Sequence, residues 1–132
     1  MILLDTHILV WVDQGNEKLD NTVRKQLDTA LADDSLAISA ISFLELAMLQ
    51  AKGRIQLPSL KRWRIELLDM GLQEIPVDGE CGIEANKLDS FHPDPADRLI
   101  VATAIHYDAT LVTADRRILT WAGKLNRIAV GE

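Results

Sequence analysis

The chain has 132 residues, of which 48% are hydrophobic and 26% charged, and its formal net charge is −6. These values are typical of one soluble globular domain spanning residues 1–132. The acidic balance argues against a protein that coats nucleic acid broadly, and no apolar run reaches the roughly 20 residues needed to cross a bilayer. A single cysteine, Cys81, excludes an internal disulfide framework. Together with a start that lacks a signal-peptide pattern, it predicts a cytoplasmic protein.

Hydrophobic periodicity and turn residues predict strands that alternate with helices along the whole chain. In chain order we expect a strand over 2–4, helices over 6–12 and 21–32, a strand over 36–38, and a helix over 42–51. A helix opened by Pro58 and stopped at Gly71 follows, then a strand over 73–75 and helices over 79–88 and 95–107. The last elements are a strand over 110–113, a helix over 116–122 and a strand over 127–129. Such alternation predicts an α/β fold with a central parallel β-sheet flanked by helices.

Four short stretches each place a carboxylate where an apolar strand gives way to a helix, or in the first turn of a helix. They are Leu3-Leu4-Asp5-Thr6, Ser42-Phe43-Leu44-Glu45, Asp94-Pro95-Ala96-Asp97-Arg98 and Leu111-Val112-Thr113-Ala114-Asp115. The carboxyl ends of parallel strands share one edge of a sheet, so these acids can meet in one crevice. Because converging carboxylates repel one another unless a cation neutralises them, the pattern points to a divalent metal site.

Each acid also has a purely structural interpretation as a helix cap. Asp5, Asp94 and Asp115 can each cap the helix that follows, and Asp97 then lies in the first turn of the helix after Asp94. Ser42 with Glu45 matches the Ser-x-x-Glu capping box. For any one acid alone, capping is the better interpretation. The joint pattern favours a metal site, because caps need not gather at matching ends of one sheet.

The ligand chemistry indicates a hard cation. Carboxylate oxygens suit Mg²⁺ or Mn²⁺, and Mg²⁺ commonly keeps water and substrate phosphate as its remaining ligands. The sequence has no Cys/His pair with zinc spacing, and its three histidines, His7, His92 and His106, are scattered. We therefore expect no histidine among the metal ligands.

These motifs carry a resemblance to PIN-domain proteins, specifically to toxins of the VapC type from toxin–antitoxin pairs. The order and spacing of the four acidic stretches match over nearly the whole chain, and His92-Pro93 before Asp94 belongs to the matching pieces. One departure is Ala96, which stands where similar proteins often carry an aromatic residue. Four motifs in register are a specific signal, whereas one alone would be weak.

The resemblance implies a Mg²⁺- or Mn²⁺-dependent endoribonuclease that acts as the toxin of a toxin–antitoxin pair. Its acidic set, both catalytic and metal-binding, is Asp5, Glu45, Asp97 and Asp115. Thr113 matches a hydroxyl residue that orients a ligand or water, while Arg98 is expected to brace the acids or to contact phosphate. The resemblance also implies an RNA substrate, a homodimer and a small cognate antitoxin protein.

The chemistry expected of such a site is attack by a metal-activated water on the scissile phosphorus, which leaves a 5′-phosphate and a 3′-hydroxyl. An aspartyl-phosphate phosphatase would usually carry a second acid two residues after the first, where this chain has His7. A PIN-like module that binds RNA or protein without cutting it is the non-enzymatic alternative. Retention of all four acids favours the nuclease.

Residues 44–68 hold more apolar side chains than one side of a small sheet would cover. Two interpretations are open for this segment. It is either ordinary core or a surface that pairs two subunits and receives an antitoxin helix. Trp63 is the side chain that would distinguish them, since an interface anchor is exposed in the free protein.

Overall fold

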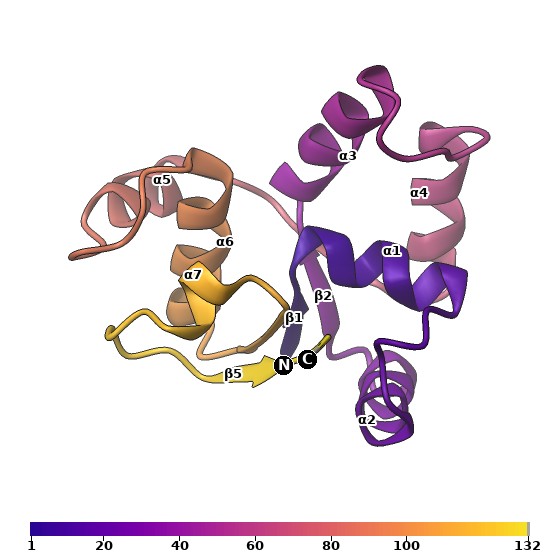
Figure 1. Ribbon diagram of the computed structural model, residues 1–132, viewed down its shortest axis with the longest axis horizontal. Coiled ribbons are helices and arrows are strands. Elements are labelled where there is room, and N and C mark those ends of the chain that lie inside the picture. Colours follow the sequence, from indigo (N-terminus) through magenta and orange to yellow (C-terminus); the bar gives the residue numbers. More distant parts are fainter. Residues whose placement is uncertain (132) are drawn as a thin grey trace.

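The computed structural model describes residues 1–131 and contains a five-stranded parallel sheet between two layers of helices (Figure 1). Its elements in chain order are β1 (Ile2–Leu4), α1 (Thr6–Gln14), α2 (Asn21–Ala32), β2 (Leu36–Ser39), α3 (Ile41–Ala51), α4 (Leu60–Asp69), β3 (Gln73–Ile75), α5 (Gly79–Asn86), α6 (Pro95–His106), β4 (Thr110–Thr113), α7 (Arg116–Leu119) and β5 (Arg127–Ala129). The strand order is β3-β2-β1-β4-β5, and every neighbouring pair is parallel. This confirms the predicted α/β fold.

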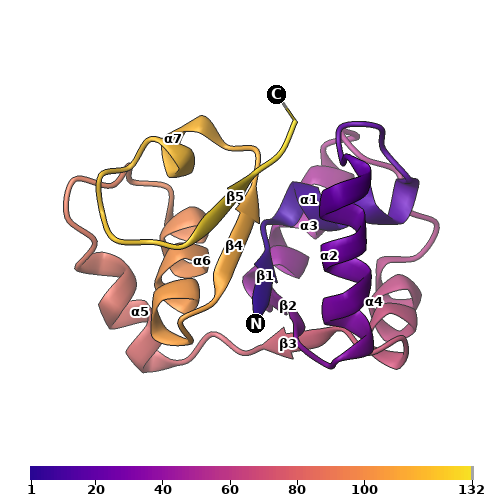
Figure 2. The same ribbon diagram turned by 90° about the horizontal axis from the view of Figure 1, so that it is seen from below.

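The sheet separates two hydrophobic cores. Helices α1 to α4 lie on one side of the sheet, and α6 and α7 lie on the other (Figure 2). Successive residues of a strand point to opposite faces, so Leu4 joins the first core and Leu3 joins the second. Leu111 and Val112 of β4 divide in the same way. Because both faces are buried, the central strands are mainly apolar and do not alternate with polar residues. This explains why the strands were recognisable in the sequence.

Helix boundaries differ from the sequence expectation where a cap competes with periodicity. The helix expected to open at Pro58 begins instead at Leu60, because Ser59 is its N-cap and the Ser59 Oγ accepts a hydrogen bond from the Arg62 backbone N–H at 3.3 Å. The final helix α7 ends at Leu119, three residues before the predicted end. Smaller differences affect α1, which extends to residue 14, and α5, which ends at residue 86. None of the helices formed by residues 1–131 is long and apolar enough to cross a membrane.

Trp63 belongs to the core. Its side chain on α4 is 8% exposed and packs edge-on against Phe43, with ring centroids 6.5 Å apart. Of the two interpretations left open for Trp63, the structure therefore supports ordinary core. Other apolar residues of the same segment do remain open, since Leu44, Met48 and Ile65 are each about half exposed.

Replacing Trp63 by alanine is expected to lower the free energy of unfolding by about 3–5 kcal/mol, because it removes a large buried side chain and leaves a cavity. Ile65→Ala on the same helix is the matched control, and it should cost less than about 1 kcal/mol because Ile65 is 55% exposed. Urea denaturation measures both values. Equal costs would contradict the placement of Trp63 in the core.

Candidate functional site

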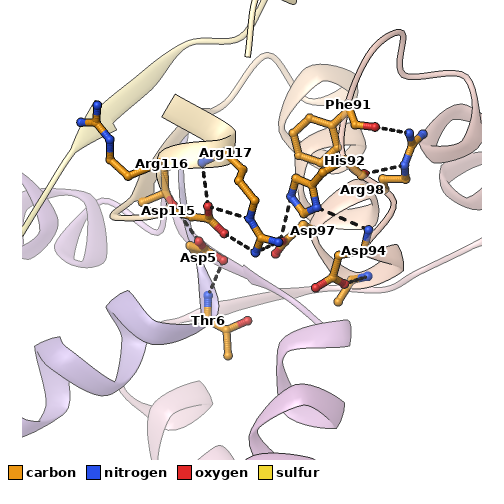
Figure 3. Close-up of polar contacts among 12 residues, drawn as sticks. Asp5, Thr6, Phe91, His92, Asp94, Asp97, Arg98, Asp115, Arg116 and Arg117 are labelled. Atoms are coloured by element: carbon orange, nitrogen blue, oxygen red, sulfur yellow. Dashed lines mark hydrogen bonds and ion pairs between the residues drawn. The ribbon is translucent and has the colours of Figure 1, made fainter. Parts of the chain in front are cut away.

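The acids gather at the carboxyl edge of the sheet, where β1 and β4 lie side by side. The chain leaves β1 toward α1 on one face and leaves β4 toward α7 on the other, so a crevice opens between the two strand ends. Asp5 follows β1 directly, and Asp115 lies two residues beyond β4 (Figure 3). The topology thus brings together acids that are far apart in the sequence.

Asp5 is held in one orientation by two hydrogen bonds. Its Oδ1 accepts from the Thr6 backbone N–H at 2.9 Å, and its Oδ2 accepts from the Thr113 hydroxyl at 2.7 Å. The residue is 8% exposed, and burial raises the pKa of its carboxyl although both hydrogen bonds act in the opposite direction. Thr113 is itself fully buried at the end of β4, and its Oγ1 also accepts from the Asp115 backbone N–H at 3.0 Å. Thr113 therefore connects two of the acids.

Glu45 reaches the site through Thr6. The Thr6 hydroxyl donates a short hydrogen bond to Glu45 Oε1 and lies 2.8 Å from the Ser42 Oγ, which is buried. Helix α3 has Ala40 as its N-cap with no side-chain capping bond, so the capping-box interpretation of Ser42 and Glu45 was wrong. Burial also raises the pKa of Glu45, and the nearby Asp5 carboxylate adds to the effect.

Asp94 and Asp97 have different roles at the start of α6. The Asp94 side chain accepts from the Ala96 backbone N–H at 3.0 Å and so caps the helix, as its structural interpretation predicted. Asp97 is 6% exposed and lies in the first helical turn, turned toward the other acids. Burial, reinforced by the surrounding carboxylates, raises the pKa of Asp97 to about 7.

Asp115 is neutralised by an arginine of the same chain. Its Oδ1 accepts from the Arg117 backbone N–H at 2.8 Å, and its Oδ2 accepts from the Arg117 Nη2 at 3.1 Å. Burial opposes ionisation of Asp115, but the bonds to Arg117 prevail and lower its pKa. The same Nη2 lies 3.5 Å from Asp97 Oδ2, whereas Arg116 points away from the acids in Figure 3. Arg117 therefore stands as a counter-cation between two carboxylates.

His92 approaches Asp97 from the opposite side. Its Nδ1 accepts a long hydrogen bond from the Asp94 backbone N–H at 3.4 Å, which assigns the proton of the neutral imidazole to Nε2. This Nε2 is buried and lies 3.1 Å from Asp97 Oδ2, although it forms no hydrogen bond within the described residues. Burial and the Arg117 charge lower the pKa of His92, which favours the neutral ring. The neutral His92 ring thus lies in contact with the Asp97 carboxylate.

Within the described residues, no hydrogen bond joins Arg98 to the acids. Its guanidinium donates to backbone carbonyls of the segment that precedes α6, namely those of Ala85, Leu88, Phe91 and His92. The expectation that Arg98 braces the carboxylates or contacts phosphate is replaced by a structural role. By binding the carbonyls of Phe91 and His92, Arg98 fixes the segment that carries the His92 ring.

All four predicted acids line one open cleft of about 330 Å³. Its side chains include Asp5, Thr6, His7, Glu45, Asp94, Asp97, Asp115 and Arg117. Within residues 1–131, the tightest group of possible ligand atoms comes from His92, Asp97 and Asp115, which lie within 4.8 Å of one another. Oxygen donors at strand and helix ends, with raised pKa values for three of the acids, fit a divalent cation that would relieve their repulsion.

Two residues of the site, His92 and Arg117, were not predicted from the sequence. His92 stands two residues before Asp94 within a motif already singled out, and Arg117 stands two residues after Asp115. Proximity to the acids along the chain was therefore an available signal. It did not suffice, because which way each side chain turns depends on packing from other elements.

Comparison with known proteins matches the chain to one family model, to a named relative and to solved structures. Residues 2–124 match the family model of the PIN domain. The chain is 36% identical over 118 residues to the protein named Ribonuclease VapC22 from Mycobacterium tuberculosis, an alignment that covers 89% of this chain and 88% of that protein.

Solved structures show the same fold. VapBC2 from Rickettsia felis, bound to a DNA fragment from the promoter, aligns with a TM-score of 0.69 at 22% identity and covers 98% of this chain and 99% of that one. A toxin–antitoxin complex from Klebsiella pneumoniae aligns with a TM-score of 0.67 at 19% identity and covers 98% of this chain and 97% of that one.

Proposed function

This chain belongs to the PIN-domain family, and from that premise we propose that it is a metal-dependent endoribonuclease, the toxin of a toxin–antitoxin pair. The observation that carries the proposal is the convergence of Asp5, Glu45, Asp97 and Asp115 on one cleft. The 36% identity of this chain to a protein named as a ribonuclease supports RNA as the substrate. We extend the PIN-like domain over residues 1–132 and place the protein in the cytoplasm.

The proposed metal ligands are the four acids Asp5, Glu45, Asp97 and Asp115, and the proposed ion is Mg²⁺ or Mn²⁺. When bound, the ion supplies activation of water and neutralisation of phosphate charge. The chain itself orients the ligands. The Thr113 hydroxyl donates a hydrogen bond to Asp5, and the Thr6 hydroxyl donates one to Glu45. Both carboxylates are therefore already oriented before substrate binds.

Arg117 and His92 complete the proposed site around Asp97. Arg117 balances the charge of Asp97 and Asp115 before substrate binds, and its side chain is 59% exposed, so it is free to turn toward a phosphate oxygen. The buried Nε2 of His92 lies 3.1 Å from Asp97 Oδ2 on the other side of that carboxylate. Arg117 and His92 together allow the negatively charged carboxylates to lie close to one another.

The test of the proposed function is cleavage of total RNA by the purified protein, with Mn²⁺ in one reaction and EDTA in the other. We expect cleavage with Mn²⁺ only, and products that carry 5′-phosphate and 3′-hydroxyl ends. Binding of RNA with no cleavage under either condition would favour the non-catalytic alternative. Hydrolysis of a small phosphate monoester would favour the phosphatase.

Mn²⁺ or Mg²⁺ is also expected to raise the melting temperature, because an ion that binds only the folded state stabilises it by mass action. An ion at 100 times its dissociation constant would add about 2.7 kcal/mol to the free energy of unfolding. Thermal melting with millimolar Mn²⁺, Mg²⁺ and Ca²⁺, each compared with EDTA, measures the effect. A variant that carries both Asp5→Asn and Asp97→Asn should lose the shift, and a shift retained there would place the ion elsewhere.

The proposed partners are a small antitoxin protein and a second copy of this chain. The similar structures include toxin–antitoxin complexes, which supports the first partner. The half-exposed Leu44, Met48 and Ile65 offer apolar surface for such contacts. Co-expression with the product of a small adjacent reading frame, followed by light scattering of the purified complex, tests both proposals. A monomer that captures no such product would contradict them.

A further inference from the structure

A second pocket adjoins the acidic cleft. It is an open depression of about 590 Å³, within the range of about 300–1,000 Å³ found for pockets that hold small ligands. Its walls include Asp89, His92, Arg117, Trp121 and Gly123. Arg117 lines both the acidic cleft and this pocket, and the His92 ring that lines it reaches Asp97. The two spaces therefore share a border made of a guanidinium and an imidazole.

The aromatic wall of the pocket is held in place. The Trp121 Nε1–H donates to the Asp89 carbonyl at 2.8 Å, and the indole packs edge-on against Phe91 with ring centroids 5.4 Å apart. A side chain at Gly123 would collide with the indole, since a Cβ there would lie 2.0 Å from the ring. Glycine thus lets the backbone lie directly against Trp121.

An arginine of β5 fixes the loop that carries Gly123. Arg127 of β5 donates from Nη2 to the Gly123 carbonyl at 3.0 Å and from Nη1 to the Ile118 carbonyl at 2.5 Å. On the other wall, Arg98 fixes the carbonyls of Phe91 and His92. The pocket is consequently formed before any ligand enters, which lowers the entropic cost of binding.

The lining chemistry suits a planar base attached to a phosphate. An indole offers an apolar surface to a base, while the imidazole and guanidinium lie on the side that faces the acids. In the free protein the Arg117 guanidinium bridges Asp97 and Asp115. If a base lay in the pocket and the scissile phosphodiester in the cleft, the backbone phosphate between them would pass next to this guanidinium. A metal ion in the cleft would take over the neutralisation of those acids and release Arg117.

We propose that the Trp121 pocket binds an unpaired RNA base of a nucleotide next to the scissile phosphate, and that Arg117 contacts the phosphate between pocket and cleft. This inference rests on the proposed ribonuclease function and adds a base-binding subsite to it. It makes Trp121 a determinant of where the RNA is cut, because only an unstacked base can enter the pocket.

The test is a double-mutant cycle between the protein and the RNA. The cleavage position in a short single-stranded RNA is mapped first, and then the base on either side of it is removed by an abasic nucleotide. The cycle compares kcat/KM of the wild type and Trp121→Leu on intact and abasic RNA. Trp121→Phe tests retention of the aromatic wall, and Tyr107→Leu replaces a half-exposed aromatic residue outside the pocket as the matched control.

We expect Trp121→Leu to lower kcat/KM on intact RNA about tenfold, in line with the loss of one base–aromatic contact. Removal of one flanking base should cost the wild type about as much and cost Trp121→Leu little more, since the two changes remove the same contact. Trp121→Phe should retain most of the activity, and Tyr107→Leu should behave as wild type. RNA binding measured in an Asp5→Asn background should show the same pattern.

Additive losses, or no loss from either abasic substitution in the wild type, would overturn the subsite and leave the ribonuclease function intact. Thermal melting of each variant accompanies the kinetics. If Trp121→Leu fails to fold, the abasic RNA with the wild type still decides the matter. A wild-type protein that neither binds nor cuts RNA would overturn the proposed function itself, and the subsite with it.

Discussion

Asp5→Asn is expected to lower metal-dependent RNA cleavage at least about 100-fold while leaving the fold intact. The substitution removes one proposed ligand, and an asparagine retains an oxygen that can accept from the Thr6 backbone N–H. Because burial raises the pKa of Asp5, an uncharged amide should leave the melting temperature in EDTA unchanged or higher. The measurements are the cleavage rate with Mn²⁺ and thermal melting without it.

Asp20→Asn is the matched control for this change. Asp20 is also an N-cap, and its side chain accepts from the Val23 backbone N–H at 2.9 Å at the start of α2, but it does not line the acidic cleft. Cleavage by Asp20→Asn should equal that of the wild type. If Asp5→Asn retained more than about a tenth of wild-type cleavage, Asp5 would leave the proposed ligand set. Equal losses in both variants would assign the effect to helix capping.

The second large effect concerns stability as a function of pH in the absence of metal. The pKa of Asp97 rises from 3.8 to about 7 on folding, so between these values the folded protein binds a proton that the unfolded chain has lost. The contribution of Asp97 to stability therefore falls as pH increases from about 4 to about 7, and it stays at its lowest value above that. The slope for one such group is at most about 1.4 kcal/mol per pH unit.

Asp97→Asn should remove this slope. We expect the wild type and the variant to be closest in stability near pH 4 and the variant to become more stable toward neutral pH, by on the order of 1 kcal/mol or more. Comparing the two proteins matters because His92, whose pKa is lowered on folding, contributes stability in the opposite direction. Urea denaturation in EDTA at several pH values measures the difference, with the exposed Asp28→Asn as control. A difference that is constant from about pH 4 to 8 would contradict the raised pKa.

Much of the fold was predictable because its signals are local. A strand buried on both faces must be apolar along its length, which made Ile2-Leu3-Leu4 and Leu111-Val112 conspicuous. Asp5 follows β1 directly and Asp115 lies two residues beyond β4, so their arrival at one sheet edge required only that the strands be parallel neighbours. Both residues also cap the following helix, so the two interpretations hold together.

The less local features needed the folded structure. The helix expected to end at residue 122 ends at Leu119, and the indole of Trp121 binds a carbonyl that lies 32 positions away. Trp63 reads as an exposed or buried residue equally well from periodicity, and only packing against Phe43 decided that it is core. These features depend on which elements pack against each other, and turn residues and hydrophobic periodicity do not predict such packing.

The strands, the parallel α/β arrangement and the acids at the strand ends could be predicted from short stretches of residues, because burial and capping act over a few neighbouring positions. The contacts that hold those acids depend on how distant elements pack. Thr113 meets Asp5 across 108 positions, and Thr6 meets Glu45 across 39. The placement of Arg117 between Asp97 and Asp115, and of the Trp121 pocket beside them, likewise follows from packing. A hydrogen bond between distant segments forms only when the cores bring its two atoms within about 3 Å, and no short stretch of sequence encodes that distance.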